Sequence, residues 1–361
     1  MSPLLPNPGT QPLRWGILST ARIVRRNWCG MRDSGAATLV ALASRDIGKA
    51  RQFIAEMQQT AAWPEAPTAH GSYESVLASR DVDAVYIPLP TGIRKEWVLR
   101  AAEAGKHVLC EKPCAISSAD LREMIACCQA NDVLFMDGVM FMHDPRFARL
   151  REILDDGESI GPVKRISSVF SFRGGEDFTT ADIRSRVALE PAGCLGDLGW
   201  FCLRASLWAM HWQLPTRVSG RILDTATDAE GHAAITEFSG ELDFPCGASS
   251  SFYCSFHSPN QKWLNISGTR GSLRVADFIA PELANDTDWE LGFEREARRG
   301  ETGITNDARM FATFAAAAND VAERAAWAEI SLKTQLVQDA CEASGRLGKP
   351  LFLHGQRYQD R

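Results

Sequence analysis

Between residue 14 and about residue 140, short apolar runs alternate with segments of helical periodicity. The apolar runs are RWGILS, TLVALAS, DAVYIPLP, HVLCEKP and VLFMDG, and segments such as RIVRRNWCGM and IRKEWVLRAAEAG separate them. Strands that are joined by helical crossovers form parallel sheets. We therefore expect an α/β protein in which residues 1–140 form a Rossmann domain, a doubly wound parallel sheet.

The pattern changes after the stretch HDPRFARLREILDDG, which ends at Gly157. VKRISSVFSF, ASSSFYCSFHS and WLNISGTRGSLRVADF have nearly alternating polarity and short turns, which is typical of antiparallel strands. A chain of 361 residues is long enough for two hydrophobic cores. We expect residues 141–361 to form a C-terminal α/β domain with a mostly antiparallel open sheet. The charged segment 285–309 predicts a surface excursion.

Composition favours a small-molecule partner. A formal net charge of -6 gives no electrostatic attraction to nucleic acid or to an anionic membrane. The first residues, MSPLLPNPGTQPLRW, lack the basic and apolar regions of a signal peptide, and the ten cysteines are scattered without a C-x-x-C pair. The sequence therefore predicts a cytoplasmic protein with reduced thiols, no metal site, no membrane contact and no nucleic-acid partner.

The turn after the first strand, GILSTARIV, lies where a Rossmann fold binds a dinucleotide pyrophosphate at a helix N-terminus. The glycine positions of G-x-G-x-x-G fall on Ser19, Ala21 and Val24, so the turn alone fits a phosphate site and an ordinary strand-helix turn about equally well. The candidate cofactor residues in this turn are Ser19, Thr20, Ala21, Arg22 and Ile23.

The end of the second strand, ALASRD, bears on the choice of dinucleotide. An acidic residue there binds a ribose 2′-hydroxyl, whereas an arginine accommodates a 2′-phosphate. Ser44 and Arg45 thus favour NADP, with NAD as the alternative, because Arg45 could be a solvated strand end and Asp46 could turn toward the ribose.

The positions of two further motifs among the predicted strands and helices indicate what each can do. Lys112, in CEKP, follows the fifth strand at the carboxyl end of the parallel sheet, where ligands bind in open α/β folds. Position alone allows either a solvent-facing lysine or one aimed at a ligand. The G-x-S-x-G match GESIG at residues 157–161 lacks the strand before and the helix after that a nucleophile elbow needs, so we predict a loop.

The stretch from Tyr73 to Pro113, ending in GKHVLCEKP, resembles the glucose-fructose oxidoreductase, inositol dehydrogenase and dihydrodiol dehydrogenase family, the Gfo/Idh/MocA family. The resemblance continues through FMDGVMFMHDPRF and GCLGDLGWFCLRASLW to SGTRGSLRV near residue 274. It implies a nicotinamide-dependent oxidoreductase that acts on the CH-OH group of a sugar, polyol or dihydrodiol, with a C-terminal sheet that mediates homo-oligomerisation. Further cofactor contacts are expected from Leu89, Pro90, Thr91, Glu111 and Lys112.

The resemblance also implies site residues. The lysine of E-K-P, here Lys112, and the aspartate of G-D-x-G, here Asp197, are expected to be catalytic. Four residues after that aspartate the family usually has a histidine or tyrosine that relays a proton, but this chain has Phe201. Thr91 and Arg94 stand where an N-x-x-H pattern is common. These departures keep open the alternative of a catalytically impaired dinucleotide-binding sensor or partner subunit.

Two more residues are candidates for substrate binding, together with Phe201. His143, in FMHDP, is expected either to bind substrate or replace the missing proton carrier, or to make a hydrogen bond between the domains. Arg184, in ADIRSR, is expected either to bind a polar substrate or to be a surface arginine.

Overall fold

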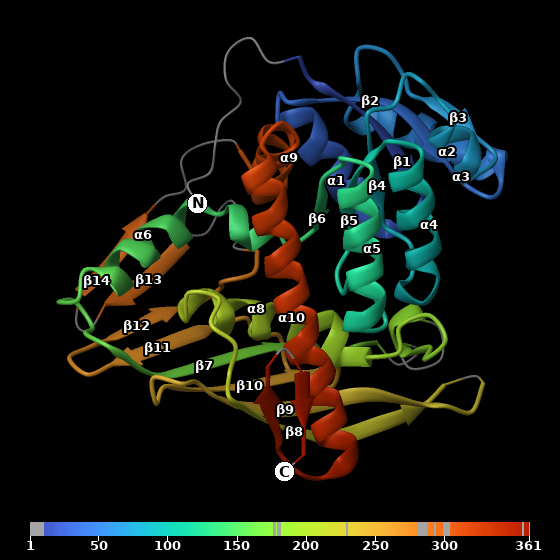
Figure 1. Cartoon of the computed structure of the whole chain (residues 1–361). Helices are drawn as coiled ribbons and strands as arrows, with labels where there is room; N and C mark the ends of the chain where they lie inside the picture. The colour runs from blue at the N-terminus through green and yellow to red at the C-terminus, as the bar shows by residue number, and fades with distance from the viewer. Residues whose placement is uncertain are drawn as a thin grey trace. The chain divides into compact units, whose positions relative to one another are not determined.

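The computed structural model describes residues 11–175, 178, 182–228, 230–280, 287–291, 294–298, 304–355 and 357–360, with backbone alone at 287–290 and 294–298. The chain divides into two compact units (Figure 1). The first unit comprises Met1–Ala115, Ala119–Pro145 and Gly303–Ser331, and the second comprises Ile116–Ser118, Arg146–Thr302 and Leu332–Arg361. Residues 1–10 of the N-terminal stretch MSPLLPNPGTQPLRW lie outside the described residues.

The first unit contains a six-stranded parallel sheet in the order β3-β2-β1-β4-β5-β6, which confirms the predicted Rossmann fold. Its strands are β1 (Leu13–Leu18), β2 (Ala37–Ala43), β3 (Thr68–His70), β4 (Ala84–Ile87), β5 (His107–Cys110) and β6 (Phe135–Asp137). Its helices are α1 (Arg22–Asp33), α2 (Ile47–Thr60), α3 (Tyr73–Leu77), α4 (Thr91–Glu103), α5 (Ser118–Ala130), the 3-10 turn η1 (Met140–His143) and α9 (Asn306–Ala317).

The helix α9 returns from late in the sequence to complete the core of the first unit. Trp15 of β1 is fully buried, and its ring lies 5.2 Å from that of Phe311 and 4.7 Å from that of Phe314, measured between centroids. Trp15 and Ile17 share one face of the strand, since side chains alternate along it. The predicted division at residue 140 did not include this return of residues 303–331 to the first unit.

The second unit contains a ten-stranded sheet in the order β14-β13-β12-β11-β7-β10-β9-β8-β15-β16. Only the β7–β10 pair is parallel among the described pairs, so the predicted mostly antiparallel sheet is confirmed. The strands are β7 (Val163–Ser171), β8 (Arg217–Thr227), β9 (Ala233–Asp243), β10 (Ser249–Ser255), β11 (Leu264–Gly268), β12 (Ser272–Val275), β13 (Thr287–Leu291), β14 (Glu294–Arg298), β15 (Leu351–His354) and β16 (Arg357–Gln359). The remaining elements are α6 (Pro145–Asp155), the 3-10 turn η2 (Ile183–Ser185), the π-helical turn η3 (Leu195–Gly199), α8 (Trp200–Ala209) and α10 (Val321–Leu347), whose residues from Leu332 onward belong to this unit.

The two faces of this sheet differ in chemistry. Helix α8 and the C-terminal half of α10 cover the face that carries Phe238, and a Cβ on Gly220 of that sheet would collide with the Cys341 carbonyl of α10 (Figure 1). The opposite face is polar. There Arg165 pairs with Glu241 across strands at 2.9 Å, and Ser167 Oγ lies 3.3 Å from Ser251 Oγ.

The charged segment 285–309 is not simply a surface excursion, and this prediction is wrong for its described part. Thr287–Leu291 and Glu294–Arg298 form β13 and β14, which extend the sheet beyond β12, and Asn306 begins α9. Residues 285–286, 292–293 and 299–303 of that prediction lie outside the described residues. The predicted loop at 157–161 is confirmed, because α6 precedes it and β7 follows it.

Candidate active site

Within the first unit, the predicted cofactor residues come together at one edge of the sheet. Parallel strands all end at the same edge, and the segments 19–23, 44–45, 89–91 and 111–112 follow β1, β2, β4 and β5, respectively. The topology therefore gathers the residues that the sequence separates by up to about ninety positions.

The turn after β1 fits a dinucleotide phosphate. Ser19 has a φ of 152°, a conformation that favours glycine, and its hydroxyl accepts a hydrogen bond from the Ala21 amide at 2.9 Å. Helix α1 then begins at Arg22 with no side chain among the described residues capping it, so its N-terminus is open to an anion. Ser19, at the first glycine position of the motif, thus has a backbone conformation that glycine adopts more readily.

The turn after β2 separates the roles that Ser44, Arg45 and Asp46 could have. Ser44 is buried and Arg45 is exposed. Asp46 is the N-cap of α2, where its Oδ1 accepts hydrogen bonds from the amides of Gly48 at 2.8 Å and Lys49 at 3.4 Å. The carboxylate of Asp46 is therefore engaged by its own helix, which leaves Arg45 as the charged side chain at this strand end.

Glu111 anchors the turn that carries Lys112. Its carboxylate accepts a hydrogen bond from the Tyr86 hydroxyl at 2.5 Å and from the Lys112 amide at 3.2 Å. Burial raises the pKa of Glu111, whereas the Tyr86 hydrogen bond and the positive charges of Lys112 and Arg94 oppose that rise. The Tyr86 hydroxyl in turn accepts from Asn27 Nδ2 of α1 at 2.5 Å. A buried polar chain thus links helix α1 to the turn that carries Lys112.

Sequence reasoning missed Tyr86 and Asn27. The signal was present, because a tyrosine inside the apolar strand DAVYIPLP needs a partner for its hydroxyl when it is buried. Burial and the neighbouring Glu111 charge raise the pKa of Tyr86 well above its ordinary value, so the phenol stays a hydrogen-bond donor.

Thr91 and Arg94, the departures from N-x-x-H, are both buried at the start of α4. The Thr91 hydroxyl lies 3.4 Å from the Pro113 carbonyl. The Arg94 guanidinium donates to the carbonyls of Leu89, Glu111 and Pro113. Both side chains therefore contact the main chain beside Lys112.

In the second unit, Asp197 lies in the π-helical turn η3, directly before α8. Arg184 Nε is 3.0 Å from Asp197 Oδ2, and Asp197 is 16% exposed against 44% for Arg184. The Asp197 charge is the main cause of a raised pKa of Arg184. The structure therefore places two residues that the sequence predicted separately in one ion pair.

Phe201 and His143 are both buried. Phe201, in the second unit, is 2% exposed and packs edge-on against Phe170 with ring centroids 5.4 Å apart. His143, in the first unit, stacks on Trp327 with ring centroids 5.0 Å apart. A role of either residue in substrate binding stays a prediction.

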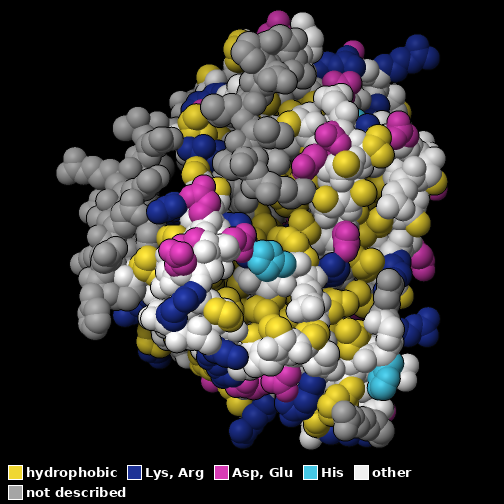
Figure 2. Space-filling view, turned by 60° about the vertical axis from the view of Figure 1, so that its left-hand side comes forward, with side chains coloured by type: hydrophobic (Ala, Val, Ile, Leu, Met, Phe, Trp, Pro, Cys, Tyr) yellow, Lys and Arg dark blue, Asp and Glu magenta, His cyan; other side chains and the backbone are white. Residues whose placement is uncertain are grey.

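Surface charge, clusters of metal-binding side chains and long apolar helices were each considered for the described residues. On the face in Figure 2, acidic and basic side chains of the described residues are interspersed. No group of three histidine, cysteine or acidic side chains among the described residues has the arrangement of a metal site. In the described part of the chain, the helices are too short or too polar to cross a membrane.

Comparison with known proteins gives a consistent assignment. Residues 13–139 match the model of an oxidoreductase family with an NAD-binding Rossmann fold, and residues 147–274 match the Gfo/Idh/MocA C-terminal domain. The NADP-dependent D-xylose 1-dehydrogenase 2 of Haloferax volcanii is 32% identical over 314 residues, covering 81% of this chain and 90% of that enzyme. The bovine trans-1,2-dihydrobenzene-1,2-diol dehydrogenase is 30% identical, covering 73% and 74%, respectively.

Two solved structures share the fold. An aldose-aldose oxidoreductase from Caulobacter crescentus, complexed with glycerol, has a TM-score of 0.81 at 24% identity and covers 95% of this chain and 100% of its own. A 3-ketoreductase from Actinomadura kijaniata, in complex with NADP and TDP-benzene, has a TM-score of 0.78 at 23% identity, covering 92% and 98%. The observed sheets, the E-K-P turn and these relatives agree that the chain belongs to the Gfo/Idh/MocA family of oxidoreductases.

Proposed function

We propose that this oxidoreductase uses NADP to interconvert a CH-OH group and a carbonyl in a sugar, polyol or dihydrodiol. The observation that carries the proposal is the position of Lys112, on a turn anchored by Glu111 at the same sheet edge as the open N-terminus of α1. Relatives named as xylose and dihydrodiol dehydrogenases support the substrate class.

The nicotinamide, when bound, supplies or accepts the hydride, and the protein's side chains manage the oxygen. We assign Lys112 to hydrogen-bond the substrate oxygen and to exchange a proton with it. Asp197, paired with Arg184, is a hydrogen-bond acceptor that orients a substrate hydroxyl. Phe201 has no group that moves a proton, so that task falls to Lys112.

The preference for NADP rests on Arg45. Its exposed guanidinium follows β2, where it is suited to a 2′-phosphate, and Asp46 is engaged as the cap of α2. The NADP-dependent relative supports the same choice.

Turnover is favoured over an impaired sensor. The xylose and dihydrodiol relatives and the two solved structures are all named for catalysis, and Lys112 and Asp197 are both present. The Rossmann domain, residues 1–140, would bind the dinucleotide, and residues 141–361 would contribute Asp197 and the oligomer contacts.

We extend the proposal to assembly and compartment. The polar face of the second unit's sheet, with its Arg165–Glu241 pair and serine hydroxyls, suits contact with a second copy of the chain. All ten cysteines are free thiols, as expected for a reducing cytoplasm.

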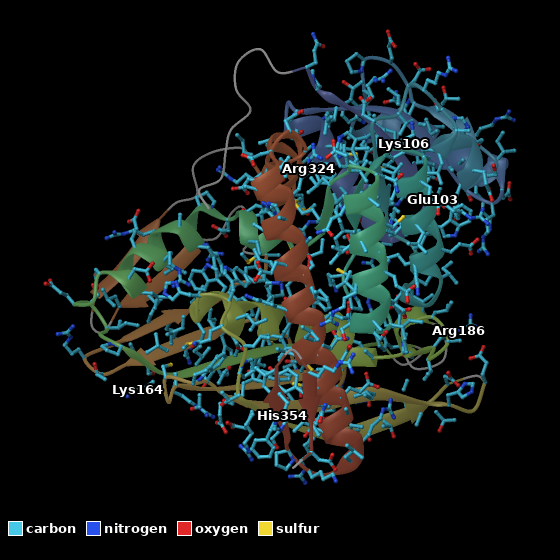
Figure 3. All side chains as sticks on the ribbon, viewed as in Figure 1. Glu103, Lys106, Lys164, Arg186, Arg324 and His354 are labelled. Atoms are coloured by element: carbon cyan, nitrogen blue, oxygen red, sulfur yellow. The ribbon has the colours of Figure 1, made fainter. Side chains whose placement is uncertain are left out.

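The test is turnover of aldoses, polyols and trans-dihydrodiols with NADP and NAD, followed by nicotinamide absorbance. We expect oxidation with NADP, and its loss in Lys112→Met with the fold and dinucleotide affinity retained. The control is Lys164→Met, at an exposed lysine on β7 (Figure 3). Parent-like turnover by Lys112→Met would remove Lys112 from the mechanism.

A further inference from the structure

Arg94 is a buried cation whose observed partners are main-chain carbonyls. It is 3% exposed, and its Nε lies 2.9 Å from the Leu89 carbonyl while Nη1 lies 2.8 Å from the Glu111 carbonyl. The guanidinium also donates to the carbonyl of Pro113, and Nη2 donates to that of Leu89. One planar group thus joins the end of β4 to the turn after β5.

The two carbonyls on that turn lie on either side of Lys112. Glu111 precedes the lysine and Pro113 follows it, so the guanidinium holds the backbone immediately before and after the proposed catalytic residue. The Glu111 carboxylate fixes the Lys112 amide from another direction. Guanidinium groups suit this task, because their N–H donors have a rigid planar arrangement and their hydrogen bonds are charge-assisted.

Burial of an arginine at this place is costly unless its donors are satisfied. A shorter or uncharged side chain at position 94 would leave the carbonyls of Leu89, Glu111 and Pro113 without these donors inside the unit. We propose that Arg94 is a positioning residue for Lys112, which it acts upon by fixing the Glu111–Pro113 backbone. This inference rests on the proposed function of Lys112 and adds a residue to it.

Lys106 offers a matched control, because it directly precedes β5, whereas the turn that carries Lys112 follows the other end of that strand. It is 8% exposed and donates to the carbonyls of Ser79 at 2.7 Å and Val82 at 2.8 Å (Figure 3). Arg94→Met and Lys106→Met each remove a buried cation bonded to main-chain carbonyls of the first unit. Of these two cations, only Arg94 bonds the turn that carries Lys112.

The kinetic arm compares these two variants with the parent on the best substrate. Misplacement of a reacting group by about 1 Å costs on the order of 100-fold in rate, so we expect Arg94→Met to lower kcat by that order with a small change in the KM for NADP. Lys106→Met should keep kcat within about threefold of the parent at a comparable loss of melting temperature. Free guanidinium ion should partly restore kcat to Arg94→Ala, whereas sodium chloride at the same concentration should not.

A second arm does not depend on turnover. The chain has eight lysines, so reductive methylation with carbon-13 gives a simple NMR spectrum in which the Lys112 signal is the one missing from Lys112→Met. We expect carbon-13 relaxation to show a more mobile Lys112 amine in Arg94→Met and an unchanged one in Lys106→Met. If Arg94→Met does not fold, Arg94→Lys replaces it, since a lysine keeps the charge but loses the planar fork.

The two arms separate the possible failures. Unchanged Lys112 mobility in the folded Arg94 variant would overturn the positioning role, whatever the activity. Equal losses of kcat in the Arg94 and Lys106 variants would also overturn it, because they would reflect stability alone. A parent without turnover on every substrate would count against the proposed function, while the mobility measurement would still decide the role of Arg94.

Discussion

The Arg184 guanidinium lies 3.0 Å from the Asp197 carboxylate in the second unit of the chain. This ion pair sets a guanidinium donor against the Asp197 carboxylate, whose oxygens accept hydrogen bonds. The Arg184 guanidinium is thus already paired with two carboxylates, that of Asp197 and that of Asp182 at 3.3 Å. A substrate carboxylate would have to compete with both of these acidic groups for the guanidinium.

We expect Arg184→Met to lower kcat/KM by about tenfold, because the part-buried Asp197 carboxylate loses the guanidinium that helps to hold it and offsets its charge. Steady-state kinetics on the best substrate measures this. Arg186→Met is the control, since Arg186 pairs with Glu230 at 2.6 Å and not with Asp197. An equal loss in both variants would count against a specific role for the Arg184–Asp197 pair.

Arg45→Ala should weaken NADP binding much more than NAD binding, because only NADP has a 2′-phosphate for the guanidinium. The loss should be about 10-fold to 160-fold, the range of one charge-assisted contact of about 1.5–3 kcal/mol. Calorimetric titration with both dinucleotides measures it. Arg51→Ala, at an exposed arginine of α2, is the control. Equal weakening of NAD and NADP would contradict the assignment of Arg45.

Phe201→Tyr tests the missing proton carrier. We expect weak parent activity on simple sugars and diols and a higher kcat in the variant, within the roughly 10²–10⁴-fold range of acid–base catalysis. Because Phe201 is 2% exposed, the new hydroxyl should also lower the free energy of unfolding by about 1–3 kcal/mol. Kinetics and urea unfolding measure the two effects. Phe170→Tyr is the control, because Phe170 is the ring that packs against Phe201. If the parent already turns over these substrates fast and Phe201→Tyr is no faster, the expected role of the missing hydroxyl is refuted.

Glu111 should make stability depend on pH. Its pKa is raised above the ordinary value of 4.5 by burial, so the folded state binds the proton more tightly than the unfolded state. The free energy of unfolding should therefore fall as pH rises from the unfolded pKa through the raised folded pKa. Urea unfolding across this window should show a smaller fall in Glu111→Gln. Identical pH slopes in parent and variant would mean that Tyr86, Lys112 and Arg94 fully offset the burial of the carboxylate.

Ser251→Arg should dissociate the proposed oligomer, because Ser251 lies on the polar face of the sheet beside Ser167. A large cation on that face would add bulk and charge to a contact between two copies of the sheet. Sedimentation velocity gives the mass of each species. Gln52→Arg, at an exposed position of α2, controls for the added charge. If Ser251→Arg keeps the parent's mass, the sheet face is not the interface.

The regular alternation of strands and helices made the first sheet predictable, since each crossover restricts the next strand to the parallel direction. The position of Lys112 followed from it, because strand ends share an edge. The strands β13 and β14, the last two at one end of the second sheet, were missed, because their charged residues lack the polarity alternation on which the prediction depended. The contacts of Arg94 are made with main-chain carbonyls, which have no sequence signature.

The Arg184–Asp197 pair was also out of reach of sequence reasoning. The two residues were singled out separately, but pairing across thirteen positions depends on how η2 and η3 are placed within the unit. The positive φ angle of Ser19 is a similar case, because the residue type left a phosphate turn and an ordinary strand-helix turn equally open and gave no sign of this backbone conformation.

The return of α9 to the first unit determines when the core of that unit can be completed during synthesis. Phe311 and Phe314 cover Trp15, yet they emerge from the ribosome long after the six strands of that unit have been made. A nascent chain that ends before residue 306 therefore leaves the indole of Trp15 without its aromatic cover. The dinucleotide-binding unit is the first to be translated, but its core is completed only near the end of translation.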